Sequence, residues 1–176
     1  MIDASEFLKK IMKDQPYLYQ SNNVRVLREI GDIAYGYGGW ILRFTYAVYN
    51  NECKYDLRYW EPENSNCSHG IRMRKDALER LFYYVDREIK NYGKQMRFEP
   101  AMHTSGKIRV LREIADIAHG DGNYILKFTY ASCDGENKYD LRYWNDDNLC
   151  SKGIRFRKND LDELWYLMKK ELGNAN

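Results

Sequence analysis

The sequence contains one module twice. Residues 24–60 match residues 108–144 at a constant offset of 84 positions, with 25 identities among 37 aligned residues. After a gap of one residue, residues 70–85 match residues 153–168. Because sequences this similar adopt the same fold, the unit to be explained is a module of about 65 residues and not one continuous domain.

Two copies are too few for a solenoid, in which three or more repeats share a continuous core. A module of this size buries little apolar surface alone, so we expect the copies to pair like the halves of a homodimer, as an intramolecular pseudo-dimer. The connecting segment reaches about 55–60 Å when extended, which permits this pairing. The expected division is an N-terminal extension (1–23) with a short helix (4–13), a first module (24–90), a linker (91–107), a second module (108–172) and a tail (173–176).

Each copy shows the pattern of four strands followed by a helix. In the first copy we expect strands at 24–33, 40–49, 54–60 and 70–74, which are rich in aliphatic and aromatic residues and are bounded by turn residues. In the second copy, Asp134-Gly135 is typical of a tight hairpin turn. The sequence therefore predicts an α+β fold made of two ββββα modules.

Apolar residues recur at helical spacing after the fourth strand of each copy. Asp76, with Glu79 three residues later, predicts the N-cap of the first helix, and Asn159 predicts the N-cap of the second. An apolar stripe on one helical face is typical of a core or dimer contact. The stripes consist of Leu78, Leu81, Phe82, Val85 and Ile89 in the first helix and of Leu161, Leu164, Trp165, Met168 and Leu172 in the second.

Composition and motif content disfavour several classes of protein. No apolar run reaches the roughly 18 residues that a membrane helix needs, and the N-terminus lacks a secretory pattern. The four cysteines form no C-x-x-C pair and the three histidines are scattered, so we expect free thiols and neither a metal nor another cofactor. The sequence has no P-loop, nucleophile-elbow, zincin or dinucleotide motif. We therefore expect a cytoplasmic, nucleoid-associated protein that is not an enzyme.

The net charge of +2 conceals an uneven distribution along the chain. Cations gather on the second to fourth strands, whereas acids other than Asp56 and Asp140 gather in loops, helices and the first strands. Strand alternation places Lys54, Arg58 and Trp60 on the same side as Asp56. The spacing of Asp56 and Arg58 favours an ion pair over a general acid. The strand cations are Arg43, Lys54, Arg58, Arg72 and Arg74 in the first copy and Lys127, Lys138, Arg142, Arg155 and Arg157 in the second.

A sheet face that mixes cations with aromatic rings suits single-stranded nucleic acid. Lys and Arg neutralise phosphates, and aromatic rings stack on bases for roughly 1–3 kcal/mol each. We therefore expect these strand cations to bind nucleic acid together with Trp40, Trp60 and Trp144. The alternative is a solvated face whose arginines pair with Asp56, Asp140 or loop acids.

The two copies also resemble a known family. Each contains K-Y-D-L-R-Y-W (54–60 and 138–144), then a polar loop, Gly-Ile and a leucine-periodic helix. This order resembles the positive cofactor four family of transcriptional coactivators, and most of all its bacterial YdbC-like branch, which Gly39-Trp40 also fits. Lys152-Gly153-Ile154 is similar to the family's Lys-Gly-Ile, whereas His69 stands at that lysine position in the first copy.

The resemblance implies a curved four-stranded antiparallel sheet with a C-terminal helix, which dimerises and binds single-stranded DNA with little sequence preference. Residue by residue, it implies that Arg58 and Arg142 contact phosphates, that Trp60 and Trp144 stack on bases, and that Lys152 lies near the nucleic-acid backbone. The family supplies one module per chain, whereas this chain supplies two.

We therefore expect a non-enzymatic single-stranded DNA-binding protein that acts in transcription, replication or repair, with proteins of those processes as further partners. RNA is a near variant of the ligand, since stacking and phosphate contacts do not exclude ribose. The alternative is a protein-interaction or scaffold module of the same fold without a DNA groove. The near-neutral charge and the acidic loop at 145–147 favour this alternative.

Overall fold

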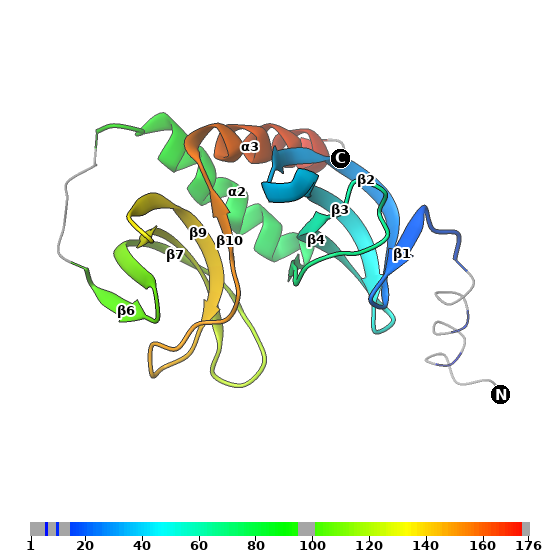
Figure 1. Ribbon diagram of the computed structural model, residues 1–176, viewed down its shortest axis with the longest axis horizontal. Helices are drawn as coiled ribbons and strands as arrows, with labels where there is room; N and C mark the ends of the chain where they lie inside the picture. The colour runs from blue at the N-terminus through cyan, green and yellow to red at the C-terminus, as the bar shows by residue number, and fades with distance from the viewer. Residues whose placement is uncertain (1–5, 7–9, 11–14, 95–100, 174–176) are drawn as a thin grey trace. The chain divides into compact units, whose positions relative to one another are not determined.

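The computed structural model describes the chain except for residues 1–5, 7–9, 11–14, 95–100 and 174–176. The chain divides into two compact units, residues 1–72 and 73–176, each with a five-stranded antiparallel sheet (Figure 1). The prediction of an α+β fold with two similar modules is confirmed. The helix predicted at 4–13 falls almost entirely outside the described residues.

Each strand pairs with its neighbour in the chain, so both sheets have the same simple order. In the hairpin at the centre of each sheet the register is the same, with Phe44 opposite Leu57 and Phe128 opposite Leu141. The first sheet comprises β1 (Tyr19–Ser21), β2 (Val24–Tyr35), β3 (Ile41–Tyr49), β4 (Glu52–Trp60) and β5 (Ile71–Met73), with a 3-10 turn at Tyr37–Gly39. The second comprises β6 (His103–Ser105), β7 (Ile108–His119), β8 (Ile125–Cys133), β9 (Glu136–Trp144) and β10 (Ile154–Phe156).

A fifth strand in each sheet corrects the predicted ββββα order. Strand β1 lies in the stretch taken as an N-terminal extension, and β6 lies in the stretch taken as a linker. Both pair with the start of the long strand that follows, Tyr19 opposite Val26 and His103 opposite Val110. The two short strands are themselves related by the offset of 84 positions, so the repeated module begins earlier than the sequence identities indicate.

The long strands β2 and β7 carry irregularities at equivalent places. In β2 the register with β3 shifts between Val26 and Arg28, between Glu29 and Gly31, and between Asp32 and Ala34, and β7 shifts at the matching residues. Each bulge bends a strand and increases its twist. Three bulges in one strand curve each sheet, so that one face of the sheet becomes concave.

The helices are α2 (Lys75–Lys90) and α3 (Lys158–Gly173), and none of the described helices is long and apolar enough to cross a membrane. The predicted N-caps are wrong by one or two residues. Helix α2 is capped by Arg74, which places Asp76 in the first turn, and α3 begins before Asn159. The predicted apolar stripes are confirmed, since Leu78, Leu81 and Val85 are buried in α2 and Leu161, Leu164 and Met168 in α3.

Helix α2 belongs to the second unit although it follows the first sheet in the sequence. It contacts both α3 and β7 (Figure 1). Glu88 receives hydrogen bonds from Arg112 Nη1 at 2.9 Å and from the hydroxyl of Tyr139 at 3.3 Å. Trp165 Nε1 donates to Asp86 at 3.0 Å. Polar contacts therefore join α2 to the second sheet and to α3.

Replacement of Glu88 by Gln should lower the free energy of unfolding by about 1–3 kcal/mol, because it leaves the half-buried Arg112 without its carboxylate partner. The change is measured by urea denaturation. Glu79→Gln is the matched control, since Glu79 lies on the same helix and makes only a long, exposed contact with Lys75. Equal losses in the two variants would contradict the assigned role of Glu88.

Candidate functional site: the inner face of each sheet

The face that carries the predicted site residues is covered. We call it the inner face; it holds Lys54, Asp56, Arg58 and Trp60 in the first sheet and their equivalents in the second. Trp60 and Trp144 have 0 % and 1 % of their surface exposed. In this structure neither ring has exposed surface with which to meet a base, and the expectation that the two rings stack on bases stays a prediction.

Strand β1 and strand β6 supply much of this cover. Trp60 packs against Val24, Val26 and Ala47, and Tyr19 of β1 meets its ring edge-on with 4.9 Å between ring centroids. In the second sheet the residues around Trp144 are Ile108, Val110 and Ala131, with His103 of β6 in the edge-on position. Each inner face thus has a small apolar core of its own.

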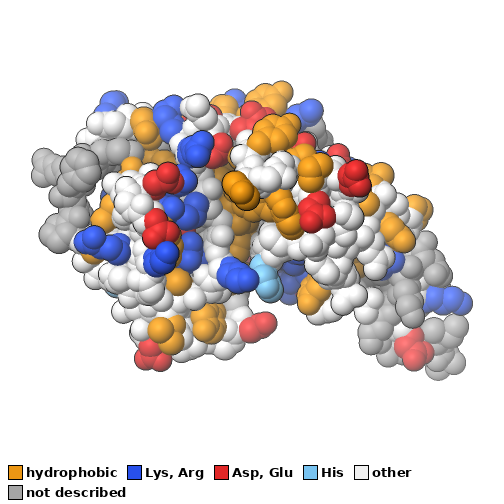
Figure 2. Space-filling view, viewed as in Figure 1, with side chains coloured by type: hydrophobic (Ala, Val, Ile, Leu, Met, Phe, Trp, Pro, Cys, Tyr) orange, Lys and Arg blue, Asp and Glu red, His pale blue; other side chains and the backbone are white. Residues whose placement is uncertain are grey.

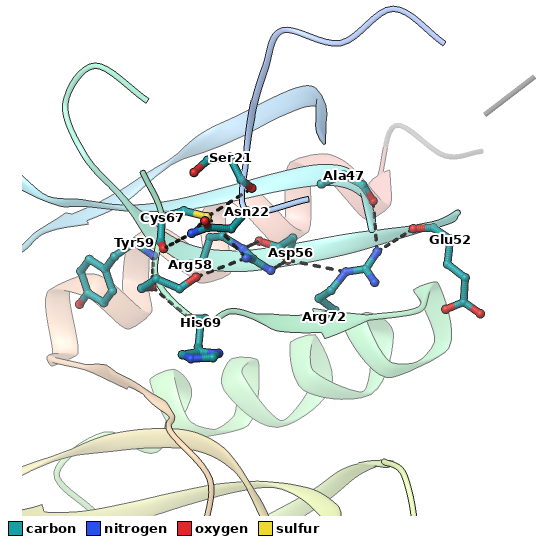
Figure 3. A network of polar contacts seen from close by, with 11 residues as sticks. Ser21, Asn22, Ala47, Glu52, Asp56, Arg58, Tyr59, Cys67, His69 and Arg72 are labelled. Atoms are coloured by element: carbon teal, nitrogen blue, oxygen red, sulfur yellow. Dashed lines mark hydrogen bonds and ion pairs between the residues drawn. The ribbon is translucent and has the colours of Figure 1, made fainter. Parts of the chain in front are cut away.

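Arg58 forms a bidentate ion pair with Asp56 (Figure 3). Its Nε and Nη2 donate to the two carboxylate oxygens at 2.6 and 2.7 Å, and its Nη1 donates to the carbonyl of Ser68 at 3.3 Å. Burial lowers the pKa of Arg58, but the hydrogen bonds and charge of Asp56 outweigh burial and hold that pKa above its ordinary value. The predicted same-side ion pair is confirmed.

Arg142 repeats this arrangement in the second sheet. It donates to Asp140 at 2.6 and 2.7 Å and to the carbonyl of Ser151 at 3.3 Å. Only 8 % of the side-chain surface of either arginine is exposed. In this structure the donors of both arginines are engaged by protein acceptors, and the expectation that Arg58 and Arg142 contact phosphates stays a prediction.

A second arginine approaches each buried aspartate. Arg72 Nε lies 3.8 Å from Asp56, and Arg155 Nε lies 3.6 Å from Asp140. Both arginines also donate to backbone carbonyls at the ends of the central hairpin. Arg72 reaches Glu52 O at 2.7 Å (Figure 3), and Arg155 reaches Glu136 O at 2.8 Å. These contacts hold the hairpin ends against the inner face. Burial is the main cause that lowers the pKa of Arg72.

The glycine before β5, and its equivalent before β10, lies directly over the arginine. A Cβ atom on Gly70 would come within 2.6 Å of Arg58 Nη2, and one on Gly153 within 2.6 Å of Arg142 Cβ. The Gly-Ile pair is part of the family resemblance. Packing explains its glycine, since a side chain at that position would displace the buried arginine.

The remaining strand cations of β3 and β8 are also paired. Arg43 is buried and contacts Asp32 at 2.6 Å and Glu29 at 3.1 Å. Lys127 contacts Glu113 at 3.1 Å and Asp116 at 3.5 Å. Burial lowers the pKa of Lys127, but the two carboxylates outweigh burial and raise it. Of the predicted interface residues, Arg43 and Lys127 are therefore tied to acids of the neighbouring strand.

The predicted cations that do reach solvent lie mainly along β10. Lys152 and Arg157 are exposed at the two ends of this strand, and Arg155 within it and Lys138 on the neighbouring β9 are partly exposed. The charges of Lys138, then of Arg157 and Arg155, lower the pKa of Glu136, so these cations share one part of the surface. Figure 2 shows Lys and Arg side chains gathered over this region. We call Lys138, Lys152, Arg155 and Arg157 the basic strip.

The first repeat has nearly the same cations. Lys54 pairs with Glu52 at 2.6 Å as Lys138 pairs with Glu136 at 2.5 Å, and Arg72 is partly exposed like Arg155. The difference is that His69 stands where the second repeat has Lys152. Trp40 is only half-buried, and Arg74 is exposed. Among the described residues, no group of three or more His, Cys, Asp or Glu side chains could hold a metal ion.

Sequence reasoning missed the residues that cover the inner face. Asn22 donates to the carbonyl of Cys67 at 3.2 Å (Figure 3). The thiol of Cys67 lies beside the backbone carbonyl of Ser21, which is also in the predicted extension. Ser21 and Ser105, and also Pro16 and Pro100, are identical at the repeat offset, and these identities are the signal that could have extended the module.

No protein-family model matches the chain, and a search of curated proteins finds no similar sequence.

Replacement of Arg142 by Met should lower the free energy of unfolding by about 3–5 kcal/mol, because it leaves the fully buried Asp140 without its bidentate partner. The loss is measured by urea denaturation. Arg109→Met, on the exposed side of β7, is the matched control and should change stability by less than about 0.5 kcal/mol. A small loss for Arg142→Met would show that the pair is not structural.

Gly153→Ala should also destabilise the protein, by about 1–3 kcal/mol, because the added methyl group overlaps Arg142 and the carbonyl of Leu141. Gly173→Ala is the control, since nothing lies within 4 Å of the methyl group there. Thermal unfolding of the two variants compares these sites directly, and an unchanged midpoint for Gly153→Ala would contradict the tight approach.

Proposed function

We propose that the protein binds single-stranded nucleic acid without catalysing a reaction and with little sequence preference, and that the basic strip makes the main contact. One observation carries this proposal. The strip holds two exposed cations, Lys152 and Arg157, at the two ends of β10, and two partly exposed ones, Arg155 in β10 and Lys138 in the neighbouring β9. A row of cations follows a phosphate backbone without reading its bases.

The charge balance favours the second unit as the binding unit. The first 72 residues contain nine Lys and Arg and nine Asp and Glu, so the net charge of +2 resides in residues 73–176. The Lys-Gly-Ile of the family resemblance also stands in the second unit, at residues 152–154. Affinity in this proposal comes from phosphate contacts, because Trp60 and Trp144 are buried.

The helices support a related proposal, that the two repeats form an intramolecular pseudo-dimer of ββββα-like modules. Helix α2 is the helix of the first repeat and α3 is that of the second, and the two contact each other. Phe82 and Trp165, which are equivalent residues, stack with 6.5 Å between their ring centroids. Equivalent residues that meet each other are typical of a two-fold interface.

The strip does not distinguish DNA from RNA, since phosphates are common to both. We propose DNA as the ligand on the resemblance to the positive cofactor four family. Roles in transcription, replication or repair, with proteins of those processes as partners in a nucleoid-associated setting, follow from the same resemblance.

One observation favours the alternative of a protein-interaction module. Tyr35 and Tyr37 are 77 % and 100 % exposed at the turn between β2 and β3, in a unit without net charge. Exposed tyrosines are common in protein interfaces. The same binding experiment separates the two functions, because a module of this kind has no affinity for an oligonucleotide.

Fluorescence anisotropy with a labelled oligo-dT tests the proposal. Binding should weaken as salt rises, and replacing Lys138, Lys152 and Arg157 together by Gln should reduce the slope of log K against log salt by about 2, at about 0.7 per phosphate contact. Arg155 is not replaced, because it donates hydrogen bonds to the backbone carbonyls of Ala131 and Glu136.

The matched control replaces Lys75, Lys90 and Lys170 by Gln, which removes the same charge from exposed helical positions. This variant should keep the salt slope of the original protein. The proposal fails if the folded protein does not bind oligo-dT at low salt, or if both triple variants lose the same affinity.

A further inference from the structure

The two short edge strands cover equivalent tryptophans with different chemistry. Tyr19 of β1 and His103 of β6 occupy the same place in their sheets, each edge-on to a buried tryptophan. Each also lies beside an acidic residue of the adjacent long strand and a cation of the next strand. The two repeats therefore have the same buried tryptophan but differ in the edge-strand side chain that packs against it.

In the first sheet the hydroxyl of Tyr19 is held by a hydrogen-bonded network at neutral pH. Arg43 donates to the hydroxyl of Tyr19 at 2.9 Å, to Asp32 at 2.6 Å and to the side-chain oxygen of Asn64 at 2.7 Å. An arginine keeps its charge throughout the physiological range. Burial raises the pKa of the Tyr19 hydroxyl, so this group also stays neutral there.

In the second sheet one ring nitrogen of the equivalent residue, His103, has no hydrogen-bond partner. Lys127 replaces Arg43 and contacts Glu113 and Asp116. Nε2 of His103 is buried without a hydrogen-bond partner and lies 3.9 Å from Glu113 Oε1. This distance is too long for a hydrogen bond to a neutral imidazole but suits an ion pair with a protonated one.

The groups that face His103 from each packed element define the local charge. Strand β7 contributes Glu113 and Asp116, β8 contributes Lys127, and β9 contributes the neutral ring of Trp144. The Arg142–Asp140 pair nearby is internally neutral, and Cys150 packs against the same small core. With a neutral His103 the cluster carries one net negative charge, and protonation of His103 removes it.

We propose that β6 is a pH-sensitive strap, which closes more firmly over the inner face of the second sheet when His103 is protonated and pairs with Glu113. Histidine is the residue whose charge changes between about pH 5 and pH 8. The neutral form leaves a buried nitrogen unsatisfied, whereas the charged form gains a carboxylate partner. The second sheet therefore responds to acidification, while β1 of the first sheet does not.

Amide hydrogen exchange of the full chain tests this proposal. Rates for residues 103–105, corrected for intrinsic pH dependence, should fall about threefold or more between pH 7.5 and pH 5.5, the effect of a partly buried ion pair. Rates for residues 19–21 in the same sample should not change. The imidazole NMR signals of His103 should change over the same pH range as the exchange rates.

Two variants separate this mechanism from a general effect of pH. Glu113→Gln should abolish the response of β6, and the double variant His103→Tyr with Lys127→Arg should make β6 as insensitive to pH as β1, because it copies the first sheet. The proposal is overturned if β6 and β1 respond equally, or if Glu113→Gln retains the response. These outcomes do not depend on whether the protein binds nucleic acid.

Discussion

A buried ion pair between an aspartate and an arginine two residues apart on one strand lies at the centre of each sheet. Asp56 and Asp140 have no exposed surface, and the bidentate arginine beside each of them is the partner that a buried carboxylate requires. The arginine in turn needs a carbonyl from the loop after the strand and a glycine above it. The position of the covering loop and the glycine of the Gly-Ile step are both tied to that one pair.

Much of this arrangement could be predicted from the sequence. The repeat predicted two like modules, and strand alternation placed Asp56 and Arg58 on one side, because residues two apart on a strand share a face. Alternation within a strand does not reveal which face is covered, so Trp60 was placed on an open surface. The cover comes partly from β1, where the repeats share Ser21 and Ser105 but exchange Tyr19 for His103.

The repeats conserve their interior and differ at their edges. Both have the same ion pair, the same packed tryptophan and the same hairpin register. Lys152 of the basic strip, the exposed tyrosines after β2 and the presence of Tyr19 or His103 on the edge strand distinguish one repeat from the other. Such differences have no role in the shared fold, so they are the places where binding and its regulation are expected to reside.

The central claim is that the K-Y-D-L-R-Y-W motif forms the inside of each sheet. The most direct measurement is the broadening of the four tryptophan indole signals by a soluble paramagnetic reagent in an NMR spectrum. The account predicts that Trp60 and Trp144 remain sharp while the half-buried Trp40 and Trp165 broaden. Broadening of Trp60 and Trp144 to the same degree would contradict the account and would restore the inner face as an open surface.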